Sequence, residues 1–389
     1  MNRVPVAAGF VLLVAAGPAA QAPPCGTMVT VDFTLEEDMT CAGTALIVGA
    51  DGITVDLGGH SLTGSGAIGS AGVRNAGYDN VTIANGTITG FFIGVHLEGA
   101  SSGTIRAITA DGNVLSGIFL EEQSDSNRIE SCVVINNGTT VHRGNGITIN
   151  TSDGNTVIGT YAAGNYTQGI FIGGGAGTAA SSNARILNNR SEQNISNGIG
   201  ILGGSGHVAT GNISMNNGAH GISLSSSATS GRVTESSVTA NTVIGNVRFG
   251  IEIRKADRNR VAANRVEANG LSGIAVIDTS ERNVVTGNRA AGNGDHGLFV
   301  AGGKNNSFRG NEFDQNGRRG ILVAPDVMFG IPKNNTFDGN HAAQNGFKIT
   351  IGPKFDVRDQ TIGNGTAGTD STYRGTRCEL SSPVEICVP

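Results

Sequence analysis

The chain has 389 residues, and 61 glycines without a strict three-residue period exclude a collagen-like fibre. Charged residues make up only 15% and the formal net charge is −5, so a highly charged disordered chain is excluded as well. A helical array would need far more Glu, Lys, Ala and Leu. Because aromatic residues make up only 5%, we expect a core built from many small aliphatic contacts.

The N-terminus has the order of a secretory signal. Asn2 and Arg3 precede an apolar run over residues 4–16, and small residues follow up to Ala22. We therefore predict a signal peptide over residues 1–22 and a secreted or periplasmic protein. The apolar run is too short to span a bilayer, and no later segment approaches the ~20 apolar residues of a transmembrane helix.

Five cysteines in a chain bound for an oxidising compartment predict disulfides. The local pairs are Cys25 with Cys41 and Cys378 with Cys387, each closing a short loop near one end of the chain. Cys132 is left over, and its place in the repeat described next predicts a packing residue rather than a reactive thiol.

An internal repeat dominates the chain. Glycine followed by an aliphatic residue recurs with a period of about 23 residues, interrupted by six-residue excursions. An apolar-x-apolar triplet follows each glycine, as in Ile118-Phe119-Leu120, and this alternation predicts a strand with its middle residue outward. The glycines are Gly94, Gly117, Gly146, Gly169, Gly198, Gly221, Gly250, Gly273, Gly297 and Gly320.

Asparagine forms two further registers beside the glycines. It stands four residues before the glycine on most coils, as at Asn217 and Asn246, and nine residues before it on several, as at Asn241. Asparagine tolerates left-handed turns, and its amide can bond to the same amide on the next coil. The registers therefore predict amide ladders along a stack of coils.

Units of this length are too short for propeller blades and lack the helix of leucine-rich repeats. The remaining fold is an all-β, single-stranded parallel β-helix (β-solenoid), right-handed by default, with about twelve coils and capped ends. We predict the β-helix over residues 46–352, with an N-terminal cap over 23–45 and a C-terminal cap over 353–389.

Three excursions fall at different bends, near residues 138–143, 173–181 and 226–234. Insertions of this kind form surface loops that can wall a groove, or they are neutral variation in length.

The phased strands, the asparagine registers, the predicted signal and the segment 51–60 (DGITVDLGGH) resemble the secreted right-handed parallel β-helix repeat proteins of the pectin-lyase-like group. That group includes pectate lyases, polygalacturonases, alginate epimerases and a periplasmic protein of the nitrous oxide reductase copper system. The resemblance covers roughly residues 45–350 and implies the fold, whereas a fold alone does not imply an activity.

One local match is more specific than this fold-level resemblance. The segment 218–225 looks like the polygalacturonase Gly-His-Gly segment, and 250–255 looks like its Arg-Ile-Lys segment with the order changed. The resemblance implies that His220 assists a catalytic acid and that Arg254 and Lys255 hold a uronate carboxylate. The family's aspartate pair is replaced by Ser196 and Asn197, so the two carboxyls that glycoside hydrolysis needs are missing.

Further candidate binding residues face outward along the coils. Arg265 and Arg289 should stack on successive coils, where an acidic glycan or the nearby Glu267 and Glu312 could neutralise them. Glu252 and Phe299 complete this set as binding residues, with Phe299 in the outward middle slot of its strand.

Near the other end, His96 and Glu98 should lie beside Glu121 on the next coil. Such a group could form a weak calcium site, an acid/base pair or solvated surface. We expect no other cofactor and no metal site, since no His, Cys or Met cluster has the spacing of transition-metal ligands.

Three functions remain open. The first is a secreted, non-catalytic protein that binds an extracellular acidic polysaccharide. The second is a polyuronate lyase or epimerase in which Arg254 or Lys255 acts as base, and the third is a periplasmic accessory factor. We expect a monomer whose partner is a polysaccharide or a cell-surface glycan, and no nucleic-acid partner.

Overall fold

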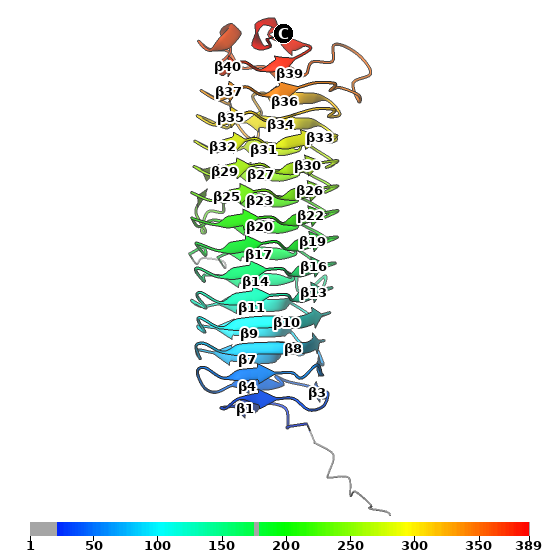
Figure 1. The fold of residues 1–389 in the computed structure, drawn as a ribbon, viewed down its shortest axis with the longest axis vertical. Helices are drawn as coiled ribbons and strands as arrows, with labels where there is room; N and C mark the ends of the chain where they lie inside the picture. The colour runs from blue at the N-terminus through cyan, green and yellow to red at the C-terminus, as the bar shows by residue number, and fades with distance from the viewer. Residues whose placement is uncertain (1–21, 175–178, 389) are drawn as a thin grey trace, which may run out of the picture.

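The structure is a computed structural model that describes residues 22–174 and 179–388. It is an elongated stack of coils, with the C-terminus at the end opposite the first strands (Figure 1). The predicted signal peptide lies almost entirely outside the described residues. Within the described residues, no helix has the length and apolar character needed to cross a membrane.

One strand from each coil contributes to a 15-stranded parallel sheet, here called face 1. The stack has about fourteen turns rather than the twelve predicted, because the terminal segments add coils of their own. Its strands are β1 (Thr27–Val29), β4 (Leu46–Val48), β7 (Ala71–Ala76), β9 (Ile93–Glu98), β11 (Ser116–Glu121), β14 (Ile147–Asn150), β17 (Ile170–Gly173), β20 (Ile199–Leu202), β23 (Ile222–Ser225), β27 (Ile251–Arg254), β31 (Ile274–Ile277), β34 (His296–Ala301), β36 (Arg319–Val323), β39 (Val357–Asp359) and β42 (Ser381–Ser382).

Face 2 follows the bend after face 1, and its strands also pair in parallel between coils. They are β2 (Phe33–Thr34), β5 (Thr54–Asp56), the first halves of β8 (Thr82–Thr89) and β10 (Thr104–Asp111), β12 (Arg128–Glu130), β15 (Thr156–Ile158), β18 (Arg185–Leu187), β21 (Val208–Thr210), β25 (Ser237–Thr239), β29 (Arg260–Ala262), β32 (Val284–Thr286), β35 (Ser307–Arg309), β37 (Thr336–Asp338) and β40 (Thr372–Arg374).

Face 3 closes each coil. Its strands are β3 (Met39–Cys41), β6 (Ser61–Gly64), the second halves of β8 and β10, β13 (Val133–Ile135), β16 (Tyr161–Ala163), β19 (Arg190–Glu192), β22 (Ile213–Met215), β26 (Thr242–Ile244), β30 (Arg265–Glu267) and β33 (Arg289–Ala291), continued by β38 (His341–Ala342) and β41 (Arg377–Cys378). A small sheet joins β24 (Val233–Thr234) to β28 (Ala256–Asp257), and two 3-10 turns, η1 (Thr366–Gly368) and η2 (Val384–Ile386), lie near the C-terminus.

The segments predicted as caps contain strands of the stack. The first three strands, within the predicted N-terminal cap, pair in parallel with the three strands of the next coil. The last strands of face 1, β39 and β42, continue that face within the predicted C-terminal cap.

Alternation of side chains explains the core. In the face 1 triplets the outer aliphatic residues point into the coil, so Ile118, Leu120, Ile251 and Ile253 are fully buried. The recurrent glycine is needed because the chain bends tightly over the core at that point. A Cβ on Gly250 would lie 2.2 Å from Cγ1 of Val266 in β30, so a larger residue there would force the core to shift.

Asparagine ladders run along the bends, as predicted. Each amide donates to the Oδ1 of the equivalent asparagine one coil later, as from Asn217 Nδ2 to Asn246 at 2.9 Å. The first ladder comprises Asn113, Asn137, Asn165, Asn194, Asn217, Asn246, Asn269, Asn293, Asn316 and Asn345. The second comprises Asn189, Asn212, Asn241, Asn264, Asn288, Asn311 and Asn340. A third, which was not predicted, comprises Asn259, Asn283, Asn306 and Asn335.

The cysteines pair as predicted. Cys25 bonds to Cys41 and Cys378 to Cys387, with Cα atoms 5.7 Å and 5.5 Å apart. Cys132 is unpaired and buried in the core, and burial raises the pKa of its thiol to about 11. A thiol that remains protonated and inaccessible is unreactive, in agreement with the predicted packing role.

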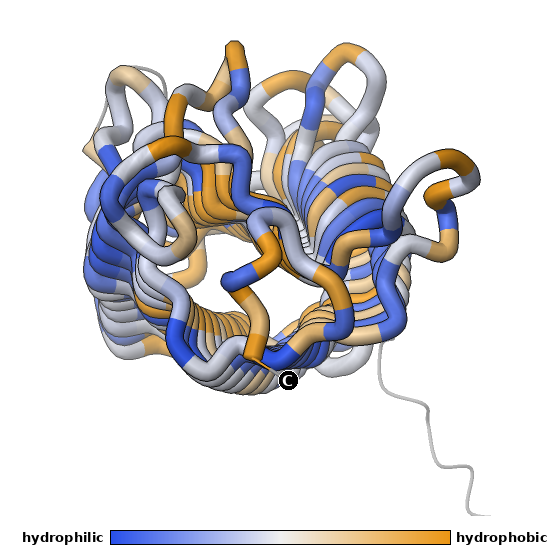
Figure 2. The backbone as a smooth tube through the Cα atoms, turned by 90° about the horizontal axis from the view of Figure 1, so that it is seen from above, coloured by the Kyte–Doolittle hydropathy of each residue, from blue (hydrophilic) through white to orange (hydrophobic). Residues whose placement is uncertain are grey.

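Several loops project beyond the outline shared by the coils (Figure 2). Two follow excursions predicted from the sequence, over residues 138–144 and 226–232, whereas the excursion near 173–181 lies partly outside the described residues. A further loop over residues 325–332 was not predicted. Backbone hydrogen bonds in both directions between Asp326 and Gly330 close it into a tight hairpin.

Candidate functional site

A groove of about 530 Å³ lies on face 1 in the C-terminal half of the stack. Strands β23 and β27 supply its floor, and the loop over residues 325–332 forms a wall. The lining residues are Asn197, His220, Ser223, Ser225, Ser226, Arg248, Phe249, Glu252, Arg254, Leu271, Ile277, Met328 and Phe329. The coil register thus brings together three residues singled out from the sequence, His220, Glu252 and Arg254.

Glu252 is the carboxylate at the floor of this groove. It occupies the outward middle slot of β27, directly beside Ser223 in β23. Ser223 Oγ donates to Glu252 Oε2 at 2.7 Å, and Glu252 Oε1 lies 3.7 Å from His220 Nε2. All three residues are at most 9% exposed, so a serine, a carboxylate and an imidazole form one buried polar group.

His220 is held from two sides. Its ring stacks on Phe249 with centroids 5.3 Å apart, and the backbone N–H of Phe249 donates to Nδ1 at 3.3 Å. Burial lowers the pKa of His220, and Arg248 and Arg254 lower it further against the opposing effect of Glu252. A neutral ring that accepts at Nδ1 carries its proton on Nε2 and turns that proton toward Glu252.

The basic residues of the groove differ in their surroundings. Arg254 Nε and Lys255 Nζ share Asp278 Oδ2, at 3.3 Å and 3.4 Å. Arg254 lines the groove, whereas Lys255 lies in the turn after β27 with a positive φ of 49°. Arg248 is exposed at the groove and has no carboxylate partner among the described residues. The two arginines therefore give the groove a positive rim above a single buried carboxylate.

The hairpin wall covers the apolar end of the groove. Asp326 Oδ1 accepts from the backbone N–H groups of Met328 and Phe329, at 2.7 Å and 3.2 Å. Phe329 packs against a small cluster that contains Ala275 and Ile277 on face 1. The loop thus presents an aromatic ring to the groove from outside the coil.

A second hollow of about 310 Å³ continues along face 1 and shares Phe249 and Leu271 with the groove. It contains Phe299, which therefore lies on the same face as Glu252. His296 lies beside Phe299, with ring centroids 6.0 Å apart, and burial lowers the pKa of His296 to about 3.

Arg265 and Arg289 lie elsewhere, on face 3. They stack on adjacent strands as predicted, and Glu267 stands between them, at 2.6 Å from Arg265 and 2.9 Å from Arg289. Arg289 also contacts Glu312 at 3.0 Å. Their neutralisation by neighbouring glutamates is one of the two alternatives that the sequence left open.

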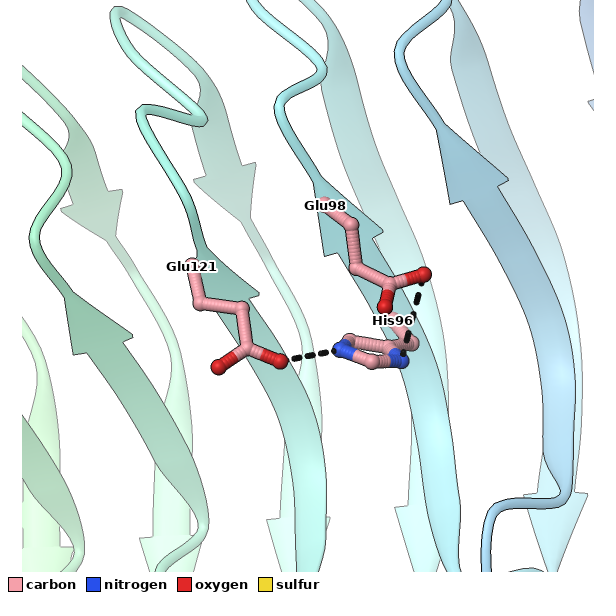
Figure 3. A group of neighbouring side chains, drawn as sticks. All are labelled: His96, Glu98 and Glu121. Atoms are coloured by element: carbon pink, nitrogen blue, oxygen red, sulfur yellow. Dashed lines mark hydrogen bonds and ion pairs between the residues drawn. The ribbon is translucent and has the colours of Figure 1, made fainter. Parts of the chain in front are cut away.

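His96, Glu98 and Glu121 form a separate cluster on face 1 near the N-terminal end (Figure 3). One nitrogen or oxygen atom from each lies within 4.8 Å of the others. His96 Nε2 is 2.9 Å from Glu121 Oε1, and His96 Nδ1 is 3.9 Å from Glu98 Oε2. The predicted register of His96 and Glu98 with the next coil is confirmed.

Several contributors to the groove were missed from the sequence, among them Arg248, Ser223, Phe249 and Phe329. Ser223 stands one coil before Glu252 in the same slot, so the repeat register contained the signal for it. Phe249 precedes a repeat glycine and could have been found in the same way. Phe329 could not, because it comes from a hairpin outside the repeat.

The sequence signature of the family described as "Right handed beta helix region" matches residues 41–183, 178–337 and 229–382. The chain therefore belongs to the right-handed β-helix family. A search of curated proteins found no significant match in sequence.

Among solved structures, the chain is similar to the A-module of the mannuronan C-5 epimerase AlgE6 of Azotobacter vinelandii, with 14% identity, 91% of each chain covered and a TM-score of 0.58. It is also similar to the periplasmic alginate epimerase AlgG, with 15% identity, 86% of this chain and 77% of that chain covered and a TM-score of 0.53. The Agl-KA catalytic domain matches at 16% identity over 86% of this chain and 59% of that chain, with a TM-score of 0.53. At these identities the likeness establishes the fold alone.

Proposed function

We propose that the groove on face 1 binds an acidic polysaccharide outside the cytoplasm. The observation that carries the proposal is the groove itself, in which Arg248 and Arg254 stand above a floor of hydrogen-bonding groups. A sugar ring presents hydroxyls along its edge and apolar C–H groups on its faces. The polar floor and the ring of Phe329 match these two kinds of surface, and the arginines match a uronate carboxylate.

The shape of face 1 supports a polymer rather than a small ligand. The groove and the second hollow adjoin through Phe249 and Leu271, so successive sugars could lie along the axis of the stack. Arg318 also lines the second hollow, where it lies 3.4 Å from Asp295 and could turn toward a uronate carboxylate. The two disulfides and the predicted signal peptide support export.

Binding of defined oligosaccharides tests the proposal. We expect oligogalacturonate or oligomannuronate to bind in isothermal titration calorimetry, with an affinity that falls as salt is added, and uncharged oligosaccharides of equal length to bind more weakly. Arg254→Ala and Arg248→Ala should each weaken binding by about tenfold, which corresponds to the loss of one charge-assisted hydrogen bond.

Arg260→Ala is the matched control, because Arg260 is exposed on face 2, away from the groove. Arg265→Ala and Arg289→Ala test the alternative of a glycan on face 3. Loss of affinity in those variants, with Arg254→Ala unaffected, would move the binding site to face 3.

A polyuronate lyase or epimerase is the second candidate, favoured by the carboxylate and the neutral imidazole that face each other beside Arg254. Removal of the proton next to the uronate carboxyl needs a base and a positive charge that stabilises the resulting anion. Lys255 and Arg254 both contact Asp278, so Glu252 or His220 is better placed than either cation to exchange a proton. Ultraviolet absorbance of unsaturated products, and proton NMR for epimerised sugars, decide whether turnover occurs.

A further inference from the structure

We propose that His96, Glu98 and Glu121 bind one divalent first-row transition-metal ion, such as Zn²⁺ or Mn²⁺. The cluster lies on face 1 of the N-terminal third, and three strands of that face (β14, β17 and β20) separate β11 from β23 in the floor of the groove. It is therefore independent of the proposed glycan site, and either proposal can fail without the other.

The coil register creates this site. His96 and Glu98 alternate on β9, so both side chains point outward, and Glu121 on β11 stands directly beside Glu98 (Figure 3). Metal–nitrogen and metal–oxygen bonds of about 2.0–2.2 Å place ligand atoms about 3.3–3.6 Å apart around a tetrahedral ion. The ligand atoms here lie within 4.8 Å of one another, so small side-chain rotations would bring all three onto one ion.

The donor set selects the class of metal. Imidazole is a common ligand of Zn²⁺ and other first-row transition metals, whereas Ca²⁺ takes six to eight oxygen ligands. The two glutamates can supply four oxygens at most. A nitrogen with two carboxylates also matches the three protein ligands that open zinc sites use, with the remaining coordination positions directed to solvent.

Neighbouring side chains hold the ligands in place. The His96 ring stacks on Phe119 with centroids 5.5 Å apart and an interplanar angle of 19°, which restricts its orientation. Arg74 Nε, from the preceding coil, contacts Glu98 Oε2 at 2.5 Å, and the same oxygen lies 3.9 Å from His96 Nδ1, so Arg74 fixes this carboxylate beside the imidazole. Contacts of this kind orient ligands in known metal sites.

The ligands are sheltered but accessible. The side chains of His96, Glu98 and Glu121 are 13%, 19% and 31% exposed, so an ion can enter from solvent and yet lose much of its hydration. The carboxylates of Glu98 and Glu121 outnumber the single guanidinium of Arg74, so the side chains around the imidazole favour a bound cation.

Titration of the metal-free, untagged protein with ZnCl₂ and with MnCl₂ tests the proposal. We expect one ion per chain and a higher melting temperature in the presence of the metal. His96→Gln and Glu121→Gln, which keep the approximate size of each side chain, should each weaken binding at least tenfold. His341→Gln is the matched control, because His341 lies on face 3 beside Asp314.

Absence of binding to both ions in the wild-type protein would overturn the proposal, as would unchanged affinity in both ligand variants. X-ray absorption of the zinc-loaded wild-type protein gives a second measurement that needs no variant to fold. One imidazole with oxygen neighbours supports the site, and two or more imidazoles or any sulfur neighbour contradict it. Circular dichroism confirms that each variant retains its strands.

Discussion

Ser223 Oγ donates a hydrogen bond to Glu252 Oε2 at 2.7 Å, across the boundary between two coils. The bond exists because the two residues share the outward middle slot of β23 and β27. It fixes one carboxylate oxygen and leaves the other 3.7 Å from His220 Nε2. The orientation of the acid in the groove is therefore a direct result of the repeat period.

Glu252→Gln separates a binding site from a catalytic site. If the groove only binds, removal of a negative charge beneath an acidic glycan should leave the affinity unchanged or raise it about two- to threefold, since like charges repel. Calorimetry with oligogalacturonate measures this change. Ser223→Ala, which keeps the charge, is the control. A tenfold loss of affinity in Glu252→Gln would contradict the binding mode, and loss of a measurable turnover would make Glu252 catalytic.

Phe329→Ala tests the hairpin wall. We expect a loss of about threefold to tenfold in glycan affinity, because the variant removes an aromatic surface from the groove. Val327→Ala, in the same hairpin but fully exposed and outside the groove, is the matched control. Equal losses in the two variants would show that the hairpin acts through its conformation and not through the Phe329 ring.

The repeat explains why so much of the site could be predicted. A strict period converts sequence distance into position along the axis, so the spacing of His220, Glu252 and Arg254 is enough to place them near one another. The same logic places Glu121 beside Glu98. The position of a side chain at a bend is harder to predict, because an insertion there changes the residue spacing while the strands of successive coils stay in register.

Asn137 illustrates the effect of an insertion. The excursion between Asn137 and Gly146 separates the ladder residue from its glycine, so the fixed spacing of four residues fails on that coil although the hydrogen bonds to Asn113 and Asn165 form.

The aromatic stack of Phe308, Phe337 and Tyr373 inside the last coils was also missed, since few aromatics suggested an aliphatic core. The composition of the chain describes its core on average, and it does not show that aromatic residues gather at one end of the stack.

Asn246→Ala tests the contribution of the first ladder to stability. Asn246 Oδ1 accepts from the backbone N–H and the amide of Asn217, and its own amide donates to Asn269. Alanine leaves these buried groups without partners, so we expect a loss of about 2–4 kcal/mol in the free energy of unfolding. Urea denaturation followed by circular dichroism measures it. Asn364→Ala, at an exposed position near the C-terminus, should change stability by less than about 0.5 kcal/mol.

His207 makes the stability of the stack depend on pH. It stands on the same bend as the third ladder, where its backbone N–H donates to Ser236 Oγ and its Nε2 lies 3.2 Å from the carbonyl oxygen of Gly203. Burial lowers its pKa to about 4, below the ordinary value of 6.5. The folded state therefore holds a neutral imidazole while the unfolded state accepts a proton. This contribution to stability is complete above pH 6.5 and is lost as the pH falls toward 4, on the order of 2–3 kcal/mol.

His207→Asn should reduce this loss, because asparagine does not titrate and its amide suits the bend occupied by Asn259 two coils later. We expect the decrease in unfolding free energy between pH 7 and about pH 4.5 to be smaller than in the wild type by roughly 2 kcal/mol. His142→Asn, in the loop over residues 138–144, controls for the loss of a histidine outside the core. An unchanged pH dependence in His207→Asn would mean that the imidazole is protonated without cost in the folded state, and that the acid sensitivity of the stack originates at other groups.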